Sequence, residues 1–501
     1  MRKLLVIMIC ILFIFVSYGL LLVKGVNTKS VIDRGISLVQ STITNKPFCK
    51  DCNIVLISLD TLSANHLPCY GYKRNTAPNL CKFAKKNITF SNMFSNANYT
   101  LPSHVSIFTG LYPSQHKVNI PHIDSLSRSI PFLPEILQQN GFMTYLFIPD
   151  NSPYLPFDKV YNRGINKIIP VEHPLDWNAG IDMLKKNNEK NQKTFLFLHT
   201  FWLHSPYLLE DVNKRFFADD DGRTNSQIPQ TKNELRKCTP QFLSYLKKVT
   251  TYELGIHFWS WDAKIKNTFQ SMYADLEKRS IDDATFCTVK EYEYFLEFYH
   301  NAFYMYLVES LNSNEVKQAV NLYDSKIKEL DIYLQGIFDQ ILSTDLKKNT
   351  IIIVTSDHGE EFMEHGQFEH AKNLFNTSIK VPLLIYIPGS EGKTVTQFAQ
   401  SVDIMPTLLN IIGVRQNITT SGFDLFDNRR NKSVYAEHLL DGNNKTIMNQ
   451  QWKLFIQKEG KKNIPYELYD MQNDPQEQNN LIFTHNDEVK RMQQYLPMTS
   501  Y

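Results

Sequence analysis

Short apolar runs, each followed by a polar loop or a helical pattern, are the feature that most constrains the fold of this chain. The first run, 53–59, reads NIVLISL and ends directly at Asp60. Unbroken runs of this length are typical of parallel strands that are buried on both faces. Similar runs follow at 143–148, 195–198, 351–355 and 383–387, with helical patterns between them, among them 134–139 and 321–341. This alternation predicts an α/β fold with a large central mixed, mostly parallel sheet flanked by helices.

Changes in pattern along the sequence divide the chain into segments. Residues 208–313 are aromatic and helical in pattern and contain no strand-like run. We expect a helical insertion over the rim of the main domain there, with a core subdomain as the alternative. Strand patterns at 452–456 and 466–469 predict a small C-terminal antiparallel sheet. The expected units are an N-terminal membrane segment (1–25), a polar stalk (26–50), a catalytic domain (51–415) that includes the insertion, and a C-terminal subdomain (416–501).

The N-terminal segment has the pattern of a membrane anchor. Residues 4–23 carry no charge and lie between Arg2, Lys3 and Lys24. Twenty apolar residues suffice to cross a bilayer as a helix, and the positive flank favours the cytoplasmic side. We therefore predict a transmembrane anchor that places the catalytic domain outside the cytoplasm, in the periplasm or the extracellular space. The alternatives are a signal peptide cleaved near Gly19, which would give a secreted protein, and a buried core helix.

Charge and cysteine content narrow the function further. The 53 basic and 51 acidic residues give a net charge of +2, which creates no field to attract nucleic acid. Six cysteines lie beyond the apolar N-terminal segment, at positions 49, 52, 69, 81, 238 and 287. Cys49-x-x-Cys52 is also the spacing of a redox pair or half a zinc site, but a second Cys-x-x-Cys is missing from the sequence. We expect structural disulfides, whose pairing the spacing leaves open.

Segment 98–110, NYTLPSHVSIFTG, predicts a helix with a hydroxyl group at its start. Pro102 suits the first turn and Gly110 the C-terminal cap, which places Thr100 just before the helix. Backbone N–H groups and the positive end of the helix dipole favour a bound phosphate or sulfate at that point. Thr100 is therefore well placed to attack an anionic ester. A capped surface helix is the alternative interpretation.

These motifs resemble those of the sulfatases in the alkaline phosphatase superfamily. The family signature is Cys or Ser, any residue, Pro-Ser-Arg, four residues, a small residue and Gly. Here Thr100 stands at the first position and His104 at the position of the Arg. The resemblance covers about 53–207 and 322–481, and includes segments 58–62, 69–72, 76–80, 401–407 and 466–475. It implies the fold of that superfamily.

The resemblance also implies a metal site. In this family the Asp at the position of Asp60 binds the catalytic metal, and Asp357-His358-Gly-Glu looks like the second metal motif. Thr61 replaces a second Asp, and His358 stands where calcium sulfatases have Asn. Imidazole favours zinc or manganese, with calcium as the alternative. We therefore expect one divalent ion on Asp60, Thr100, Asp357 and His358, and this ion would lower the pKa of the threonine hydroxyl.

Other residues are substrate contacts by the same resemblance. His204, in His-Ser-Pro, matches a family histidine that is a substrate contact or leaving-group acid. His370 or Lys372 takes the place of a family lysine that contacts sulfate. His116 matches a family histidine near the site, and His104 replaces the family arginine.

Threonine at position 100 argues against the usual sulfatase reaction. Sulfatases oxidise Cys or Ser to formylglycine, and a sulfo-threonine could not collapse by the same elimination. A phospho-threonine can be resolved by in-line attack of water or an alcohol. We expect a metal-dependent hydrolase of phosphate, phosphonate or sulfate esters, with a glycan or lipid headgroup as the substrate. The alternatives are a phosphoethanolamine or phosphoglycerol transferase that modifies surface glycans and a catalytically inactive binding protein, which His104 favours and the intact metal set opposes.

Overall fold

The structure is a computed structural model of the chain. It describes residues 49–119, 124–149, 160, 163–205, 207, 216–217, 313–415, 418–427, 433–440, 443–459 and 462–497. The predicted membrane segment, the predicted stalk up to residue 48 and almost all of the predicted insertion at 208–313 lie outside these residues.

The prediction of a transmembrane helix or signal-anchor requires correction. Within the described ranges, no helix is both long and apolar enough to span a membrane. The longest one, α13 (Ser313–Leu342), has 30 residues and carries charged side chains along its length. This finding conflicts with the anchor, which is not retained. Residues 4–23, for which the anchor was predicted, lie outside the described residues.

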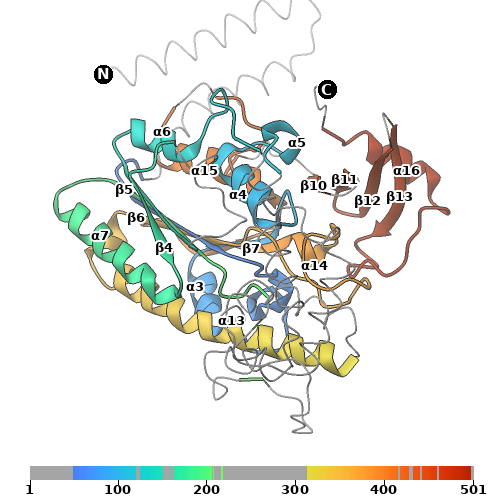
Figure 1. Cartoon of the computed structure of the whole chain (residues 1–501), viewed down its shortest axis with the longest axis horizontal. Coiled ribbons are helices and arrows are strands. Elements are labelled where there is room, and N and C mark those ends of the chain that lie inside the picture. Colours follow the sequence, from blue (N-terminus) through green and yellow to red (C-terminus); the bar gives the residue numbers. More distant parts are fainter. Residues whose placement is uncertain are drawn as a thin grey trace, which may run out of the picture.

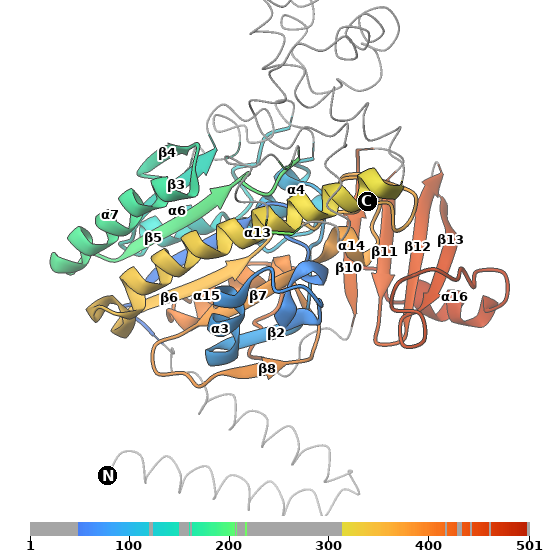
Figure 2. The same ribbon diagram turned by 90° about the horizontal axis from the view of Figure 1, so that it is seen from below.

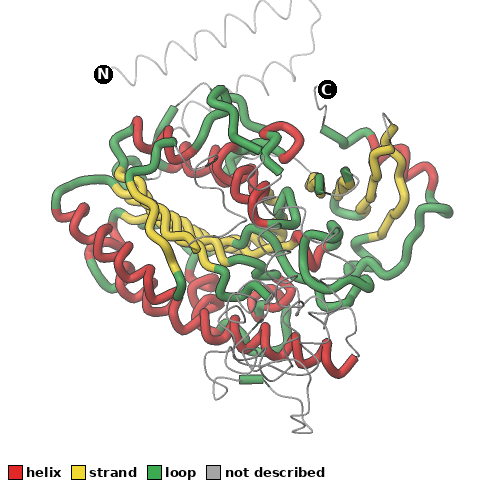
Figure 3. Tube along the Cα trace, in the orientation of Figure 1, coloured by secondary structure: helices red, strands yellow, loops and turns green. Residues whose placement is uncertain are grey.

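A nine-stranded mixed sheet forms the centre of the molecule (Figures 1 and 3). The strand order is β4-β3-β5-β1-β6-β7-β2-β8, and β9 pairs with β2. The first five strands in this order are parallel, whereas β7 is antiparallel to both β6 and β2. The predicted mixed, mostly parallel sheet is therefore confirmed. The strands are β1 (Asn53–Leu59), β2 (Ile88–Phe94), β3 (Met143–Pro149), β4 (Lys167–Val171), β5 (Thr194–Thr200), β6 (Thr350–Thr355), β7 (Lys380–Tyr386), β8 (Lys393–Val395) and β9 (Ala399–Gln400).

Helices cover both faces of this sheet, as the two ribbon views show (Figures 1 and 2). Successive side chains of β1 point to opposite faces, so Ile54 and Leu56 join one apolar core while Val55 and Ile57 join the other. The first core is closed by α4 (Thr100–Thr109), α6 (Leu133–Gln139) and α15 (Ile404–Ile411). The second is closed by α3 (Pro78–Lys86), α7 (Trp177–Glu189) and α13. Shorter helices are α5 (Pro113–His116), α14 (Asn376–Ile379), η1 (Ala64–His66), η2 (Pro68–Tyr70), η3 (Pro174–Asp176), η5 (Asp345–Lys348) and η6 (Ser401–Asp403).

The C-terminal part forms a separate four-stranded antiparallel sheet, in agreement with the sequence. Its strands are β10 (Val434–His438), β11 (Asn444–Met448), β12 (Trp452–Glu459) and β13 (Lys462–Asp470), and α16 (Asn486–Gln493) packs against them. Hydrogen bonds join this sheet to the segment before α4. Asn96 Nδ2 donates to Tyr435 O over 2.7 Å, and His438 Nδ1 donates to Asn98 Oδ1 over 2.9 Å.

Two disulfides lie in the described part of the chain, Cys49–Cys52 and Cys69–Cys81. The first agrees with a structural bridge at the Cys-x-x-Cys spacing. Cys238 and Cys287 lie outside the described residues.

The loop after β1 is held in an unusual conformation. Thr61 has a φ of 57°, a left-handed conformation that a β-branched residue rarely adopts. The buried Tyr323 of α13 holds this loop, because its hydroxyl donates to Thr61 O over 2.6 Å and accepts from Ser63 N over 3.1 Å. A residue 262 positions away therefore sets the path of the chain directly after Asp60.

Tyr323→Phe should lower the free energy of unfolding by about 1–3 kcal/mol, because it leaves a buried donor and a buried acceptor without a partner. Chemical denaturation measures this loss. Tyr386→Phe is the matched control, since its hydroxyl donates to Lys347 O near the surface, and it should cost about 1 kcal/mol or less. Equal losses in the two variants would show that Tyr323 does not hold the loop.

Candidate metal centre and active site

The carboxyl ends of three adjacent strands meet at one edge of the sheet. β1 pairs in parallel with both β5 and β6, and Ser58 lies level with His199 on one side and Thr355 on the other. Asp60 directly follows β1, and Asp357 lies two residues after β6. In open α/β sheets, ligand sites form at this edge. His199, Asp60 and Asp357 are all fully buried there.

Helix α4 brings Thr100 and His104 to the same place. The helix begins at Thr100 itself, one residue earlier than predicted, and ends at Gly110 in a left-handed cap with φ 67°. His104 follows Thr100 by one helical turn, so both side chains lie on the same face of α4. The positive end of the helix dipole lies at Thr100.

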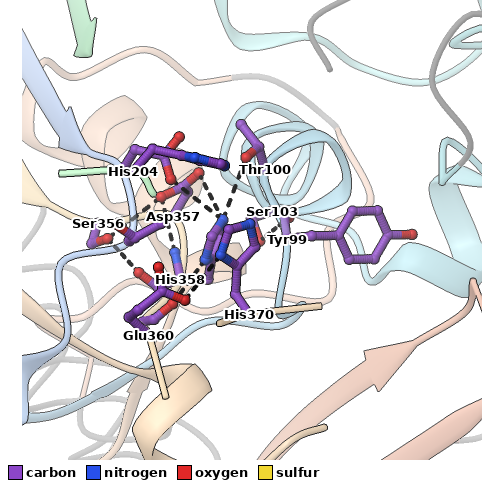
Figure 4. A network of polar contacts seen from close by, with 12 residues as sticks. Tyr99, Thr100, Ser103, His204, Ser356, Asp357, His358, Glu360 and His370 are labelled. Carbon is purple, nitrogen blue, oxygen red and sulfur yellow. Dashed lines mark hydrogen bonds and ion pairs between the residues drawn. The ribbon is translucent and has the colours of Figure 1, made fainter. Parts of the chain in front are cut away.

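Asp60, Thr100, Asp357 and His358 converge on one point, and Figure 4 shows the last three together. The ligand atoms of Asp60, Asp357 and His358 lie within 4.8 Å of one another. His358 Nε2 is 3.6 Å from Asp60 Oδ1 and 3.5 Å from Asp357 Oδ2. The hydroxyl oxygen of Thr100 is 3.3 Å from the same nitrogen. The four residues expected to bind a metal are thus neighbours, while the metal itself stays a prediction.

Three of the four carboxylate oxygens of Asp60 and Asp357 have no hydrogen-bond donor in the part of the chain that the structure describes. Both oxygens of Asp60 and Oδ2 of Asp357 are buried without a partner among the described residues. Burial raises the pKa of Asp60 well above its usual range, and the nearby carboxylates of Asp357 and Glu360 add to this. Buried carboxylates without donors require a cation or a proton. The donor set therefore fits a divalent metal ion.

The tautomer of His358 also suits a metal ligand. Its Nδ1 lies 3.0 Å from Gly359 O. Because a carbonyl can only accept, Nδ1 carries the hydrogen, and Nε2 directs its lone pair toward the two carboxylates.

Beside this cluster lie His204, His370 and Glu360 (Figure 4). The ring centroids of His370 and His358 are 4.4 Å apart, and those of His370 and His204 are 4.9 Å apart. Glu360 Oε1 is 3.0 Å from His370 Nδ1. Burial raises the pKa of Glu360 to about 8, so this carboxyl group holds a proton at neutral pH. Burial and the neighbouring His370 lower the pKa of His204 to about 3, so its ring is neutral.

Of the other predicted substrate contacts, Lys372 lies near Glu360 and His370, whereas His116 is bonded within the fold. Lys372 is half-buried, and its charge acts on both Glu360 and His370. The ring of His116 donates from Nε2 to Ser106 Oγ over 3.2 Å and accepts at Nδ1 from Val118 N over 3.1 Å. Both of its nitrogens are engaged within the fold. The structure therefore does not bring His116 to the cluster as a substrate contact.

Two residues of the site were given no chemical role by the sequence. Glu360 directly follows the Asp-His-Gly motif in the sequence. This position next to two predicted metal ligands was the only sign that it belongs to the site. The other residue is His199, whose Nε2 lies 3.8 Å from Asp60 Oδ2. Its position depends on the pairing of β5 with β1, which no local pattern reveals.

The chain matches the family model "Sulfatase" over residues 52–414 and the model "N-sulphoglucosamine sulphohydrolase, C-terminal" over 363–498. The chain therefore belongs to the sulfatase family. Arylsulfatase K of Mus musculus is 32% identical over 185 residues, which are 34% of this chain and 33% of the relative. The matched stretch thus spans about a third of that relative's length.

Solved structures share the fold. The phosphonate monoester hydrolase of Agrobacterium radiobacter superposes with a TM-score of 0.61 at 18% identity, covering 88% of this chain and 94% of that one. A protein solved in complex with its substrate D-glucosamine-2-N,6-O-disulfate gives 0.60 at 19% identity, covering 88% and 96%. At 18% and 19% identity, these likenesses show a shared fold.

Glu369→Gln should change how stability depends on pH in the metal-free protein. Burial and the neighbouring Glu360 raise the pKa of Glu369 to about 7, above about 4.3 for an unperturbed glutamate. The stability from this retained proton is present at low pH and lost as pH rises through 7. The variant does not titrate, so its stability relative to the parent should increase from pH 4.5 to pH 8 by up to about 3 kcal/mol. Urea titrations in EDTA across that range test this, and a constant difference would contradict it.

Proposed function

We propose that this protein is a metal-dependent hydrolase of anionic esters that uses Thr100 as its nucleophile. The observation that supports this is the position of the Thr100 hydroxyl. It lies at the N-terminus of α4, 3.3 Å from His358 Nε2, beside three carboxylate oxygens of Asp60 and Asp357 that have no donor among the described residues. A hydroxyl group at this point faces both the positive end of a helix dipole and a cluster suited to a cation.

The residues that would hold the metal are Asp60, Thr100, Asp357 and His358. The imidazole of His358 favours zinc or manganese, with calcium as the alternative. An ion bound there would lower the pKa of the threonine hydroxyl and offset the negative charge of the ester. Lys372 is the candidate contact for the rest of the anionic group.

The proposed reaction has two steps. Thr100 Oγ1 loses its proton and forms a bond to phosphorus, while the bond from phosphorus to the leaving oxygen breaks and that oxygen takes up a proton. Water then attacks the phospho-threonine, which releases phosphate and restores the hydroxyl. Glu360 holds a proton at neutral pH and lies next to His370, so this pair is a candidate source for the leaving group. His204, on the other side of His370, has a neutral ring and is a candidate substrate contact.

Phosphate or phosphonate esters are the favoured substrates. A phospho-threonine can be resolved by water, whereas a sulfo-threonine lacks the elimination route of formylglycine. The shared fold with a phosphonate monoester hydrolase supports this choice. The neighbour solved with a disulfated glucosamine supports a sulfated glycan as the alternative substrate.

We further propose that the enzyme works outside the cytoplasm. The disulfides Cys49–Cys52 and Cys69–Cys81 support this, because such bridges persist in oxidising compartments. The catalytic domain is proposed to span 51–415, followed by a C-terminal subdomain over 416–501.

Thr100→Ala should lower kcat by at least ~10³-fold, because the covalent pathway is lost while the other three ligands remain. Thr100→Ser should keep part of the activity. A trapped phospho-enzyme should appear by mass spectrometry on the peptide that contains Thr100.

Thr109→Ala is the matched control, since this threonine lies on the same helix and its hydroxyl donates to Val105 O. It should retain turnover. A Thr100→Ala protein as active as the parent would move catalysis to another residue.

Removal of metal should abolish activity toward the preferred ester, and zinc or manganese should restore it. The assay compares an aryl phosphate, a phosphodiester, a phosphonate and an aryl sulfate, before and after chelation. Full turnover in protein shown to be free of metal would contradict the proposal. Efficient cleavage of the sulfate alone would contradict the preference for phosphorus.

A further inference from the structure

A second group of buried ligands lies beside the cluster described above. His104, His199 and Asp357 each offer one ligand atom, and these three atoms lie within 4.8 Å of one another. All three side chains are completely buried. We propose that they form a second cation site, which takes a zinc-like transition-metal ion and shares Asp357 with the first site.

The hydrogen bond of His199 provides the main argument. Its Nδ1 lies 3.0 Å from Ser58 O and must donate to that carbonyl. The lone pair of the neutral ring is therefore on Nε2, which lies 3.8 Å from Asp60 Oδ2. Both atoms are buried without a hydrogen-bond partner in the described part of the chain. Two acceptors that face each other away from water repel unless a cation or a proton lies between or beside them.

His104 completes the group from α4. Its Nε2 is 4.0 Å from Asp357 Oδ2 and 2.9 Å from Ser58 Oγ. The serine hydroxyl can rotate, so its contact does not fix this nitrogen as a donor. The rings of His104 and His199 meet nearly at right angles, with centroids 4.5 Å apart. Two ligands about 2 Å from one tetrahedral ion lie about 3.4 Å apart, so only small shifts are required.

The surroundings and donor types specify the kind of ion. Phe197 packs edge-on against His104, and Phe201 packs against His199, which surrounds the nitrogens with apolar groups. Two imidazoles and one carboxylate favour zinc over calcium or magnesium, which prefer oxygen ligands. In the first site, His358 is oriented as His199 is in the second: its Nδ1 donates to a backbone carbonyl and its Nε2 faces carboxylates. His199 thus presents its lone pair as His358 does, with Nδ1 donating to a backbone carbonyl and Nε2 facing a carboxylate.

Metal content tests this directly and does not depend on the nucleophile or the ester. The full chain is expressed with zinc, dialysed, and measured by inductively coupled plasma mass spectrometry. We expect two zinc ions per chain in the parent, one in His199→Ala and His104→Ala, and at most one calcium ion in protein loaded with calcium. His116→Ala is the control, since this buried histidine bonds Ser106 and Val118 instead, and it should keep two.

Anomalous diffraction from zinc in crystals of the parent protein gives a second measurement that needs no variant. A peak within bonding distance of His199 Nε2 supports the inference. A single peak at Asp60, Asp357 and His358 overturns it and leaves the proposed one-metal hydrolase intact. A single peak at His104 and His199 would support this site and contradict the proposed metal position. Two zinc ions retained in a folded His199→Ala protein would also overturn the inference.

Discussion

The structure around the site depends on the burial of two carboxylates at the ends of β1 and β6. Asp60 and Asp357 are completely buried, and three of their four oxygens have no hydrogen-bond donor within the described ranges. Such an arrangement is costly unless a cation balances it. The central strand, the start of α4 and the surrounding imidazoles therefore form a cluster of donor atoms that suits a cation.

The rigidity of this edge comes from segments that are far apart in the sequence. Ser356 Oγ lies 2.5 Å from Leu59 O and accepts from Leu62 N over 3.0 Å, which links the ends of β6 and β1. Tyr323 of α13 holds Thr61 from the other side. Precise positions for Asp60 and Asp357 follow from these links, because each loop is fixed by a neighbouring element and not by its own sequence alone.

Much of the fold could be predicted because buried parallel strands leave continuous apolar runs, as in 53–59 and 351–355. Strand β2, ITFSNMF, carries polar residues in its middle, and no run marked it. Asp60, Thr100, Asp357 and His358 were found because each belongs to a local motif. The contact of His199 with Asp60 requires the pairing of β5 with β1, and the engagement of both nitrogens of His116 requires the fold around α4 and α5. Neither contact can be predicted from the residues next to His199 or His116 in the sequence.

The small antiparallel sheet makes hydrogen bonds to Asn96 and Asn98, and these bonds join the two sheets across their border. Asn98 precedes Thr100 by two residues, and its amide is held by His438 and by the carbonyl of Asn373. A shortened protein that ends near residue 415 would keep the entire nine-stranded sheet and every residue of the cluster. It would nevertheless lose part of what orients the segment leading into α4. The C-terminal sheet therefore supports the start of α4 although none of its residues belongs to the cluster.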